Sequence, residues 1–433
     1  SRYTRRCITE DPSWSLVTVP HLTELCLRHI VHNFEKNPIL DHLLPEHQRK
    51  VVDRLSTSLP LAVTANRVSD EDYWRRCCVE RWQVCDVSSY GDSWKRMFFE
   101  RHLENILKFF IPNTTDPNQV LELIPLCRGY VRKLEIDQFL PPVQVDQKEG
   151  RNDLSDTEDD AEFGEVCTHH YDLKDLVTAL PHLEELHLTY GVKGCGMNFE
   201  WSLFNFTEQD CSNLAAAVRM CRKLKVFKLT RSKVDDDNIK VLAHNLMDHP
   251  CLLELDLSHN LIRDKGAQAL GKLISRSRLE TLNLCNNQIH HLGAQALAQA
   301  LAESSTLTSL NLRLNCVEDK GGEAIGHALL TNTSLKSLHL GSNNLSEPTA
   351  TVFSQVLAQN SSLTTINFSC NHLRLDGGKQ LLKGLANNKT LTELDLRQAE
   401  VDQETDFLIH QIVWANREAV RLRSLQHLTA GPL

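Results

Sequence analysis

The sequence predicts an α/β solenoid built from strand-plus-helix units, and three observations support this prediction. First, the pattern Leu-x-x-Leu-x-Leu, with Phe or Ile at a few of the leucine positions, recurs seven times. Second, the copies follow one another at intervals of 27 or 28 residues, starting at Leu224, Leu252, Leu279, Leu307, Leu335, Leu363 and Leu391. Third, an apolar periodicity typical of helices follows the copies. A fixed period of this size is typical of a solenoid.

Each copy is expected to begin with a short strand and a turn. The alternation Leu-x-Leu places two leucines on one side of a strand and the residues between them on the other side. Five copies continue with an asparagine that is followed two residues later by an apolar side chain. This asparagine lies where the chain leaves the strand, and its amide is suited to satisfy backbone groups of the turn. The predicted structural ladder consists of Asn260, Asn287, Asn315, Asn343 and Asn371.

The second half of each copy is expected to be a helix, with apolar residues three and four positions apart such as Ala267, Leu270 and Ile274. One unit buries too little apolar surface to offset the entropy lost in ordering its backbone, so the units must stack. Strands stack about 4.8 Å apart, whereas helices need about 10 Å. The stack therefore bends into a horseshoe with a concave parallel sheet on the inside.

The solenoid is expected to span residues 131–433, because leucine patterns also begin at Val131 and Leu183. Residues 146–165 contain nine acidic and two basic residues, which predicts a solvated insertion loop. A second insertion, residues 191–206, is glycine-rich and aromatic and is expected to pack on one edge of the array. A capping helix over residues 402–425 is expected to cover the last core face with one apolar stripe: Leu408, Ile412, Ala415, Ala419 and Leu422.

Residues 1–130 predict a mainly helical region. Helices are expected over roughly 46–58, 69–82 and 92–110, with Ser69 as an N-cap. Leu22, Leu25 and Leu27 instead follow the strand pattern of the repeats. A set of aromatic residues at helical spacing predicts a core rather than a binding site. Its members are Trp74, Trp82, Trp94, Phe98, Phe99, Phe109 and Phe110.

Neither the composition nor the motifs of this chain indicate a catalytic site. The net charge of -9 argues against nucleic acid as the main partner, because phosphate binding needs a basic face. No apolar run approaches the roughly 20 residues of a membrane span. Neither metal-ligand spacing nor a nucleophile motif is present in the sequence. We therefore expect no catalytic residue, metal, cofactor or small-molecule substrate, and neither nucleic acid nor membrane as a partner.

The predicted concave face is a candidate protein-docking surface, since a rigid curved sheet loses little entropy on binding. The polar residues that alternate with the strand leucines project from it. The alternative is an inner face that is simply solvated. The candidate binding residues are Lys228, Glu254, Asp256, Ser258, Asn283, Asn311, Arg313, His339, Asn367, Glu393, Asp395 and Arg397.

The helices that begin Gly266-AQALGKLI, Gly293-AQALAQAL and Gly321-GEAIGHAL make these units similar to ribonuclease-inhibitor-type leucine-rich repeats. With its tryptophan-rich N-terminal region and acidic insertion, the whole chain resembles leucine-rich repeat subunits of the nexin-dynein regulatory complex. That resemblance implies a cytoskeletal location in the axoneme of cilia and flagella, beside the doublet microtubules. It implies a scaffold that docks other subunits of that complex and helps to regulate dynein-driven motility, including that of sperm.

Residues 59–101 support an alternative function. The run Trp74-RR-Cys77-CVER-Trp82, followed by Ser93-Trp94-KRMFFE-Arg101, resembles the segment after the first helices of F-box and elongin-A-type proteins. This resemblance implies a substrate adaptor of a ubiquitin ligase, with a Skp-type or elongin-C-like partner on the N-terminal region and the horseshoe as receptor. GTPase activation, implied by relatives with this repeat type, is a third possibility.

Overall fold

The computed structural model describes residues 5–6, 18–19, 21–141, 169–198 and 201–429, and the chain divides into two compact units. The first comprises residues 1–105 and 118–131, and the second comprises residues 106–117 and 132–433. The predicted acidic loop at 146–165 lies outside the described residues.

The first unit is mainly helical, as the sequence predicts. A two-residue antiparallel pair, β1 (Arg5–Arg6) and β2 (Thr18–Val19), precedes the helices. The helices are α1 (Leu22–His32), α2 (Pro45–Val52), α3 (Leu61–Thr64), α4 (Glu71–Arg81), η1 (Ser88–Tyr90), α5 (Trp94–Lys108, which continues into the second unit) and α6 (Asn118–Cys127).

Two local predictions for this unit are wrong. The strand-like pattern at Leu22, Leu25 and Leu27 lies inside helix α1, where Leu22 is exposed. A strand here would have no neighbouring strand to pair with, so this segment forms a helix instead. Helix α4 is capped by Asp70 rather than Ser69, and the Asp70 carboxylate accepts a hydrogen bond from the Tyr73 N–H at 2.9 Å.

Aromatic side chains form the core of the first unit. Trp74, Phe98 and Phe99 are buried, and the Trp74 ring centroid lies 5.0 Å from that of Phe98 and 5.2 Å from that of Phe99. Lys95 is buried beside them, with its Nζ 2.9 Å from the Val68 carbonyl. The predicted aromatic core is therefore confirmed for these rings. Trp82 and Trp94 are half-buried, and Phe109 is exposed, so its inclusion in the core was wrong.

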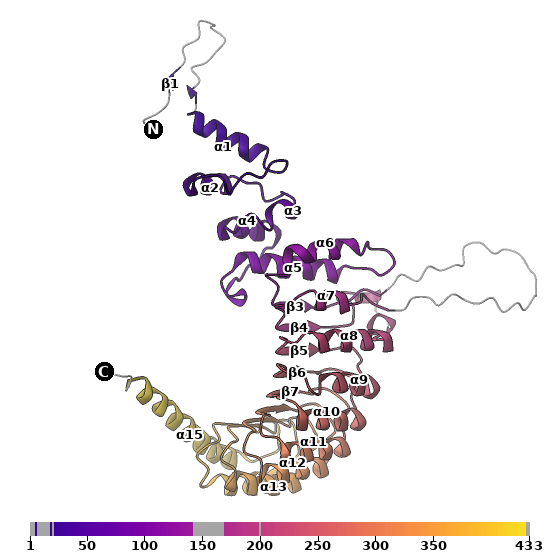
Figure 1. Ribbon diagram of the computed structural model, residues 1–433. Helices are drawn as coiled ribbons and strands as arrows, with labels where there is room; N and C mark the ends of the chain where they lie inside the picture. Colours follow the sequence, from indigo (N-terminus) through magenta and orange to yellow (C-terminus); the bar gives the residue numbers. More distant parts are fainter. Residues whose placement is uncertain (1–4, 7–17, 20, 142–168, 199–200, 430–433) are drawn as a thin grey trace, which may run out of the picture. The chain divides into compact units, whose positions relative to one another are not determined.

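The second unit is the solenoid (Figure 1). Nine strands form one parallel sheet in chain order: β3 (Lys133–Ile136), β4 (Glu185–Leu188), β5 (Val226–Leu229), β6 (Glu254–Asp256), β7 (Thr281–Asn283), β8 (Ser309–Asn311), β9 (Ser337–His339), β10 (Thr365–Asn367) and β11 (Glu393–Asp395). The leucine positions of neighbouring strands lie opposite one another; for example, Leu310 pairs with both Leu282 and Leu338.

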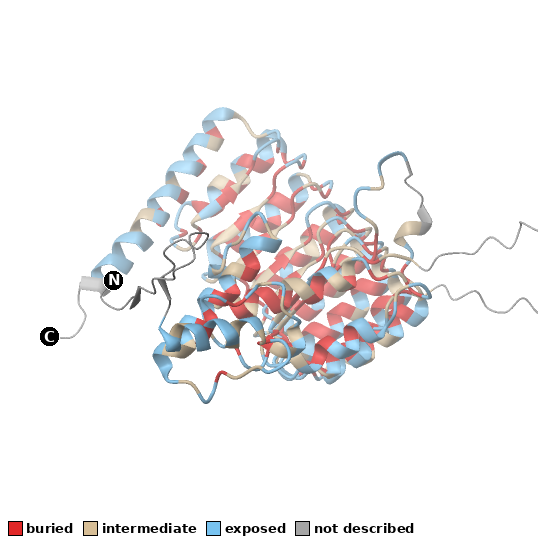
Figure 2. Cartoon of the chain, turned by 90° about the horizontal axis from the view of Figure 1, so that it is seen from above, coloured by how far each residue is buried: buried red, intermediate tan, exposed pale blue. Residues whose placement is uncertain are grey.

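Helices cover the outer side of this sheet. They are α7 (Lys174–Thr178), α8 (Glu208–Met220), α9 (Asp236–Leu246), α10 (Asp264–Arg276), α11 (His291–Glu303), α12 (Glu318–Leu329), α13 (Glu347–Gln359) and α14 (Arg374–Leu385), and α15 (Gln403–Thr429) follows the last strand at the end of the array. Buried residues follow the strands and the helix faces turned toward them (Figure 2). Each strand from β6 to β10 has a buried central leucine or isoleucine between two half-buried residues, which confirms the inside-outside alternation.

The predicted asparagine ladder is present. Asn343, for instance, is fully buried, and its Nδ2 donates to the carbonyls of Leu340 in its own turn and Leu312 in the preceding repeat, at 3.1 and 2.8 Å. Its Oδ1 accepts from the Val317 N–H of the preceding repeat at 3.3 Å. Asn260, Asn287, Asn315 and Asn371 make equivalent bonds. In the repeat before Asn260, the buried Ser232 takes this position, and its hydroxyl accepts from the Tyr190 N–H.

A second ladder, which was not predicted, joins the C-terminal ends of the helices. Asn360 shows its pattern: Nδ2 donates to the carbonyls of Leu329 and Asn332 in the preceding repeat, and Oδ1 accepts from the N–H groups of Ser362 and Leu363. The equivalent residues in other repeats are His249, Ser277, Ser304, Asn332, Asn388 and Asn416, each of which hydrogen-bonds at this position. Because the residue type varies, the sequence pattern hides this ladder.

Helix α15 lies where a capping helix is predicted, but a different face is buried. Ile409 and Val413 are buried, whereas Leu408 and Leu422 of the predicted stripe are exposed. Both stripes have helical spacing, so periodicity alone does not choose between them. The second insertion contains two short helices, η2 (Gly196–Asn198) and η3 (Trp201–Phe204). The Phe204 ring lies so close to Gly191 that a Cβ there would be 2.5 Å from it.

The first prediction concerns the leucine core. Leu310→Ala should lower the free energy of unfolding by about 2 to 5 kcal/mol, because Leu310 is 1% exposed and truncation leaves a cavity between repeats. Arg313→Ala, at an exposed position of the same repeat, should change it by less than about 0.5 kcal/mol. Chemical denaturation of both variants measures the difference. Equal damage would contradict the assignment of inside and outside.

The second prediction concerns His249. Its Nδ1 accepts from the Leu252 N–H at 3.1 Å, its Nε2–H donates to the Cys221 carbonyl at 3.0 Å, and burial lowers its pKa. The unfolded chain therefore binds the proton more readily than the folded chain, so stability should fall as the pH drops below about 6.5. Asparagine fills this position in later repeats with the same bonding pattern. His249→Asn should fold normally at pH 7.5 and lose less stability between about pH 7 and pH 5.

Urea denaturation across this pH range measures the effect. The control is His244→Asn, at an exposed position of helix α9, which ends before His249; this variant should keep the pH response of the unsubstituted chain. An unchanged pH response in His249→Asn would show that His249 does not make stability depend on pH.

Candidate protein-docking face

The strands of the solenoid present two rows of side chains on the concave face. One row precedes the buried leucine of each strand and the other follows it, so Glu254 and Asp256 flank Leu255 as Glu393 and Asp395 flank Leu394. Eleven of the twelve predicted binding residues are half-buried or exposed here or just beyond the strands. Ser258 is the exception: it is 6% exposed, and its backbone N–H donates to Asp256. Ser258 is therefore part of the turn and offers little contact surface.

The first strands of the sheet carry mutually paired charges. Lys228 Nζ lies 2.6 Å from Glu254 Oε1 across β5 and β6. On β3 and β4, the contact with His187, 3.8 Å away, contributes most to holding the pKa of the Glu135 carboxyl far below its usual range, and Lys133 Nζ lies 2.9 Å from the same carboxylate. These charges compensate one another within the sheet, so a partner gains little from pairing with any one of them.

The central strands β7 to β10 present hydroxyl and amide groups instead of carboxylates. Their concave residues are Thr281, Asn283, Ser309, Asn311, Ser337, His339, Thr365 and Asn367. Burial lowers the pKa of His339, which favours its neutral form at pH 7. One predicted binding residue beside this stretch is charged: Arg313, which is exposed and lies just beyond β8. This central surface can therefore exchange hydrogen bonds with a partner at low desolvation cost, because few ionised groups are covered.

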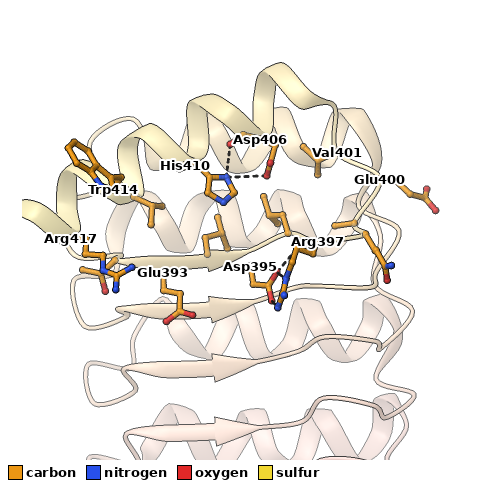
Figure 3. A pocket seen from close by; sticks show the side chains of 15 residues that line it. Glu393, Asp395, Arg397, Glu400, Val401, Asp406, His410, Trp414 and Arg417 are labelled. Atoms are coloured by element: carbon orange, nitrogen blue, oxygen red, sulfur yellow. Dashed lines mark hydrogen bonds and ion pairs between the residues drawn. The ribbon is translucent and has the colours of Figure 1, made fainter.

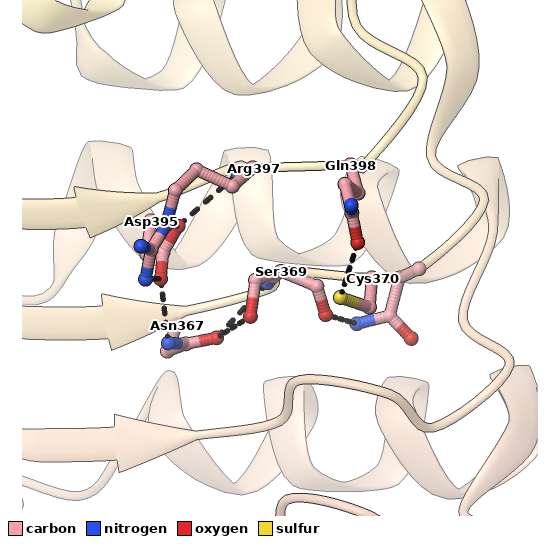
Figure 4. A network of polar contacts seen from close by, with 7 residues as sticks. Asn367, Ser369, Cys370, Asp395, Arg397 and Gln398 are labelled. Carbon is pink, nitrogen blue, oxygen red and sulfur yellow. Dashed lines mark hydrogen bonds and ion pairs between the residues drawn. The ribbon is translucent and has the colours of Figure 1, made fainter.

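The last two strands form a connected polar network (Figure 4). Asn367 Nδ2 donates to Asp395 Oδ2 at 2.9 Å, and Arg397 donates to both carboxylate oxygens of Asp395 at 2.9 and 2.7 Å. The bond to Arg397 contributes most to lowering the Asp395 pKa. Asn367 Oδ1 accepts from Ser369. These side chains hold one another in place, while Arg397 stays largely exposed and available to a partner.

A groove runs along the outer edge of β11 (Figure 3). One wall is the strand and its turn, residues 392–401, and the other is helix α15. His410 projects from the helix toward the strand, Trp414 and Arg417 also line the groove, and His410 Nδ1 lies 3.3 Å from Asp406 Oδ1. Trp414 is 65% exposed. Sequence reasoning missed this groove because a strand edge and a helix that follows it in the chain form it together.

The described residues contain neither a metal-binding cluster nor a membrane-spanning helix. Among the described residues, no three His, Cys, Asp or Glu side chains gather so that they could hold a metal ion. No helix in the part of the chain that the structure describes is long and apolar enough to cross a membrane. Gly271 and Lys272, which end a Gly-x-x-x-x-Gly-Lys run, lie within helix α10 rather than in a phosphate-binding loop.

Comparison with known proteins adds family relationships to this geometry. The leucine-rich repeat family matches residues 248–271, 303–326, 331–347 and 359–382. Over 421 residues the chain is 65% identical to dynein regulatory complex subunit 5 of Macaca fascicularis, covering 97% of this chain and 84% of that protein. The Homo sapiens protein of the same name is 61% identical over 272 residues, covering 63% of this chain and 54% of that protein.

The repeats also match a more distant protein. Ribonuclease inhibitor of Sus scrofa is 29% identical over 103 residues, which covers 23% of each chain. This match agrees with the predicted similarity of the repeats to those of ribonuclease inhibitor, and with the parallel nine-stranded sheet.

Proposed function

The chain belongs to the family of dynein regulatory complex subunit 5, and from this premise we propose that it is a non-enzymatic scaffold subunit of that complex in the axoneme of cilia and flagella. In this role it helps to regulate dynein-driven motility by holding other subunits of the complex in place beside the doublet microtubules. The family relationship supports the assembly, and the rigid inner sheet of the solenoid supports the scaffold role.

The concave face of β5 to β11 is the proposed docking surface. The observation that carries this assignment is the neutral, hydrogen-bonding centre of the sheet, set on strands that the buried asparagine ladder joins from repeat to repeat. A prearranged surface loses little conformational entropy when a partner binds. The flanking residues Lys228, Glu254, Asp395 and Arg397 supply charge at the rims of the neutral stretch and fix the orientation of the partner.

The third prediction tests this face. Asn283→Arg combined with Asn311→Arg places two bulky cations at the neutral centre, so association with the other complex subunits should weaken at least about tenfold by desolvation and steric conflict. The matched control is Gln268→Arg combined with Gln295→Arg, which adds the same charge at exposed positions on helices α10 and α11. The measurement is the fraction of each full-length variant that co-purifies with axonemal subunits in ciliated cells lacking the endogenous protein.

The control pair should co-purify as the unsubstituted chain does. Equal loss in both variants, or none in either, would contradict the assignment of the concave face. A freely soluble pool of the unsubstituted chain with no axonemal fraction would contradict the scaffold role. Co-purification with a Skp-type or elongin-C-like adaptor in place of axonemal subunits would favour the ubiquitin-ligase alternative.

A further inference from the structure

Each strand of the solenoid holds the next by the same backbone hydrogen bonds. The carbonyl of Thr308 accepts from the N–H groups of Lys336 and Ser337, at 2.8 and 3.0 Å. One repeat later, the Lys336 carbonyl accepts from Thr364 and Thr365 at the same two distances, and the Thr364 carbonyl accepts from Thr392 and Glu393 in turn. The equivalent acceptor on the last strand is the carbonyl of Thr392.

The backbone N–H donors between strands also recur from one repeat to the next. The Leu340 N–H donates to the Asn367 carbonyl at 2.8 Å, and the Phe368 N–H donates to the Asp395 carbonyl at 2.9 Å. A little further on, the Cys370 N–H donates to the Arg397 carbonyl at 2.8 Å. The equivalent donors on the last strand are the N–H groups of Leu396 and Gln398. Together with Thr392 they form a complete set for holding one more strand.

These groups have no partner among the described residues. Strand β11 is the end of the sheet and pairs only with β10 within the described part of the chain. The Thr392 carbonyl and the N–H groups of Leu396 and Gln398 make no hydrogen bond with another described residue. Leu394 lies opposite Ile366 in the parallel pairing of β10 with β11. In such a pair the backbone groups of alternate residues point to opposite sides of the strand, and those of Leu394 point away from β10, toward the free edge.

The free edge faces the groove against helix α15 rather than open solvent (Figure 3). The groove has a volume of about 870 Å³ and contains Leu394, Leu396 and Val413, which are 5 to 8% exposed, in its apolar floor. Trp414 forms the outer part of the helix wall. The groove therefore combines backbone donors and acceptors at strand spacing with an apolar floor.

We propose that this groove binds an extended segment of a partner protein, which adds to β11 as a tenth parallel strand. A helix does not fit this role, because its backbone groups are already bonded internally and would leave the β11 edge unpaired. An extended segment satisfies the edge and offers alternate side chains to the floor. This site lies at the edge of the sheet and does not depend on docking at the concave face.

The repeat register specifies the segment. The bonds to Thr392, Leu396 and Gln398 span roughly six residues of a parallel strand. Two alternate positions of that strand lie opposite Leu394 and Leu396. Apolar side chains are favoured at these positions because both leucines are buried. The position opposite Glu393, which is exposed and has no ion pair with another described residue, favours a hydroxyl or basic side chain and disfavours an acid. The ligand class is therefore an extended, apolar-alternating segment without a carboxylate at that position.

The fourth prediction uses a synthetic peptide as the probe. Residues 306–313 of this chain, TLTSLNLR, already form the corresponding strand in an inner repeat and carry no acid. A fluorescent peptide of this sequence should bind the full-length chain saturably, as measured by fluorescence anisotropy. N-methylation of its serine, whose N–H would donate to the Thr392 carbonyl, should weaken binding at least tenfold. N-methylation of the leucine that follows, whose N–H points away from β11, should weaken it less than threefold.

Variants of the protein locate the site. Trp414→Ala should weaken peptide binding at least fivefold by removing the outer wall of the groove. Leu422→Ala, at another exposed apolar position of helix α15 outside the groove, should leave binding unchanged. Thermal melts confirm that both variants fold. The pair Asn283→Arg and Asn311→Arg should bind the peptide normally, which separates this site from the concave face.

Several outcomes would overturn the proposal. One is the absence of saturable binding up to 1 mM peptide. Equal weakening by the two N-methyl groups would show that no strand pairing occurs. Unchanged affinity in Trp414→Ala would place the peptide elsewhere. Sedimentation of the chain as a dimer that Trp414→Ala dissociates would show that a second copy, and not a partner's segment, occupies the edge.

Discussion

The side chain of each ladder asparagine bonds at both ends to the repeat before it. In Asn371, Nδ2 donates to the Leu340 carbonyl at 3.0 Å while Oδ1 accepts from the Leu345 N–H, also at 3.0 Å. These groups are buried, so any shift between repeats would leave polar atoms unpaired in an apolar interior. The spacing of the strands, and with it the placement of every concave side chain, depends on this contact. At the helix ends, His249, Asn332, Asn360, Asn388 and Asn416 add a second side-chain bond to the preceding repeat.

How much of this the sequence predicts depends on whether a pattern repeats. The leucine strands from β5 on, the asparagine ladder and the helices from α9 to α14 follow from a regular period, and all are present. The second ladder was not predicted, since His249 and Asn332 make equivalent bonds through different side chains and Ser277 bonds only within its own turn. The strand predicted at Leu22 failed because a single copy has no neighbour to pair with. The buried face of α15 was misjudged because two stripes fit the same helical period, and only the end of the solenoid selects between them.

For the candidate docking residues, too, the sequence predicts one property and leaves another open. Alternation along the strands predicts which side chains lie on the concave face, and eleven of the twelve are half-buried or exposed there or just beyond the strands. Which of them are already engaged is a matter of contacts between strands, as in the Asn367, Asp395 and Arg397 network, and no single repeat reveals it. The groove beside β11 depends on where a later helix comes to lie, so it is visible only in three dimensions. Face and edge together give the solenoid two surfaces of different chemistry, one of side chains and one of backbone.

The helix-end ladder also has a consequence for covalent modification. Asn332, Asn360 and Asn388 are each followed two residues later by Ser or Thr, so all three read as acceptor sites for N-linked glycans. In the fold, these amides are 3 to 9% exposed and their Nδ2 groups are bonded to carbonyls of the preceding repeat. The nearby hydroxyls belong to the same turns; Ser362 Oγ, for example, donates to Asn360 Oδ1 at 3.1 Å. A sugar could reach these nitrogens only if the solenoid opened, so the tripeptides here are a by-product of stacking chemistry and no guide to a secretory route.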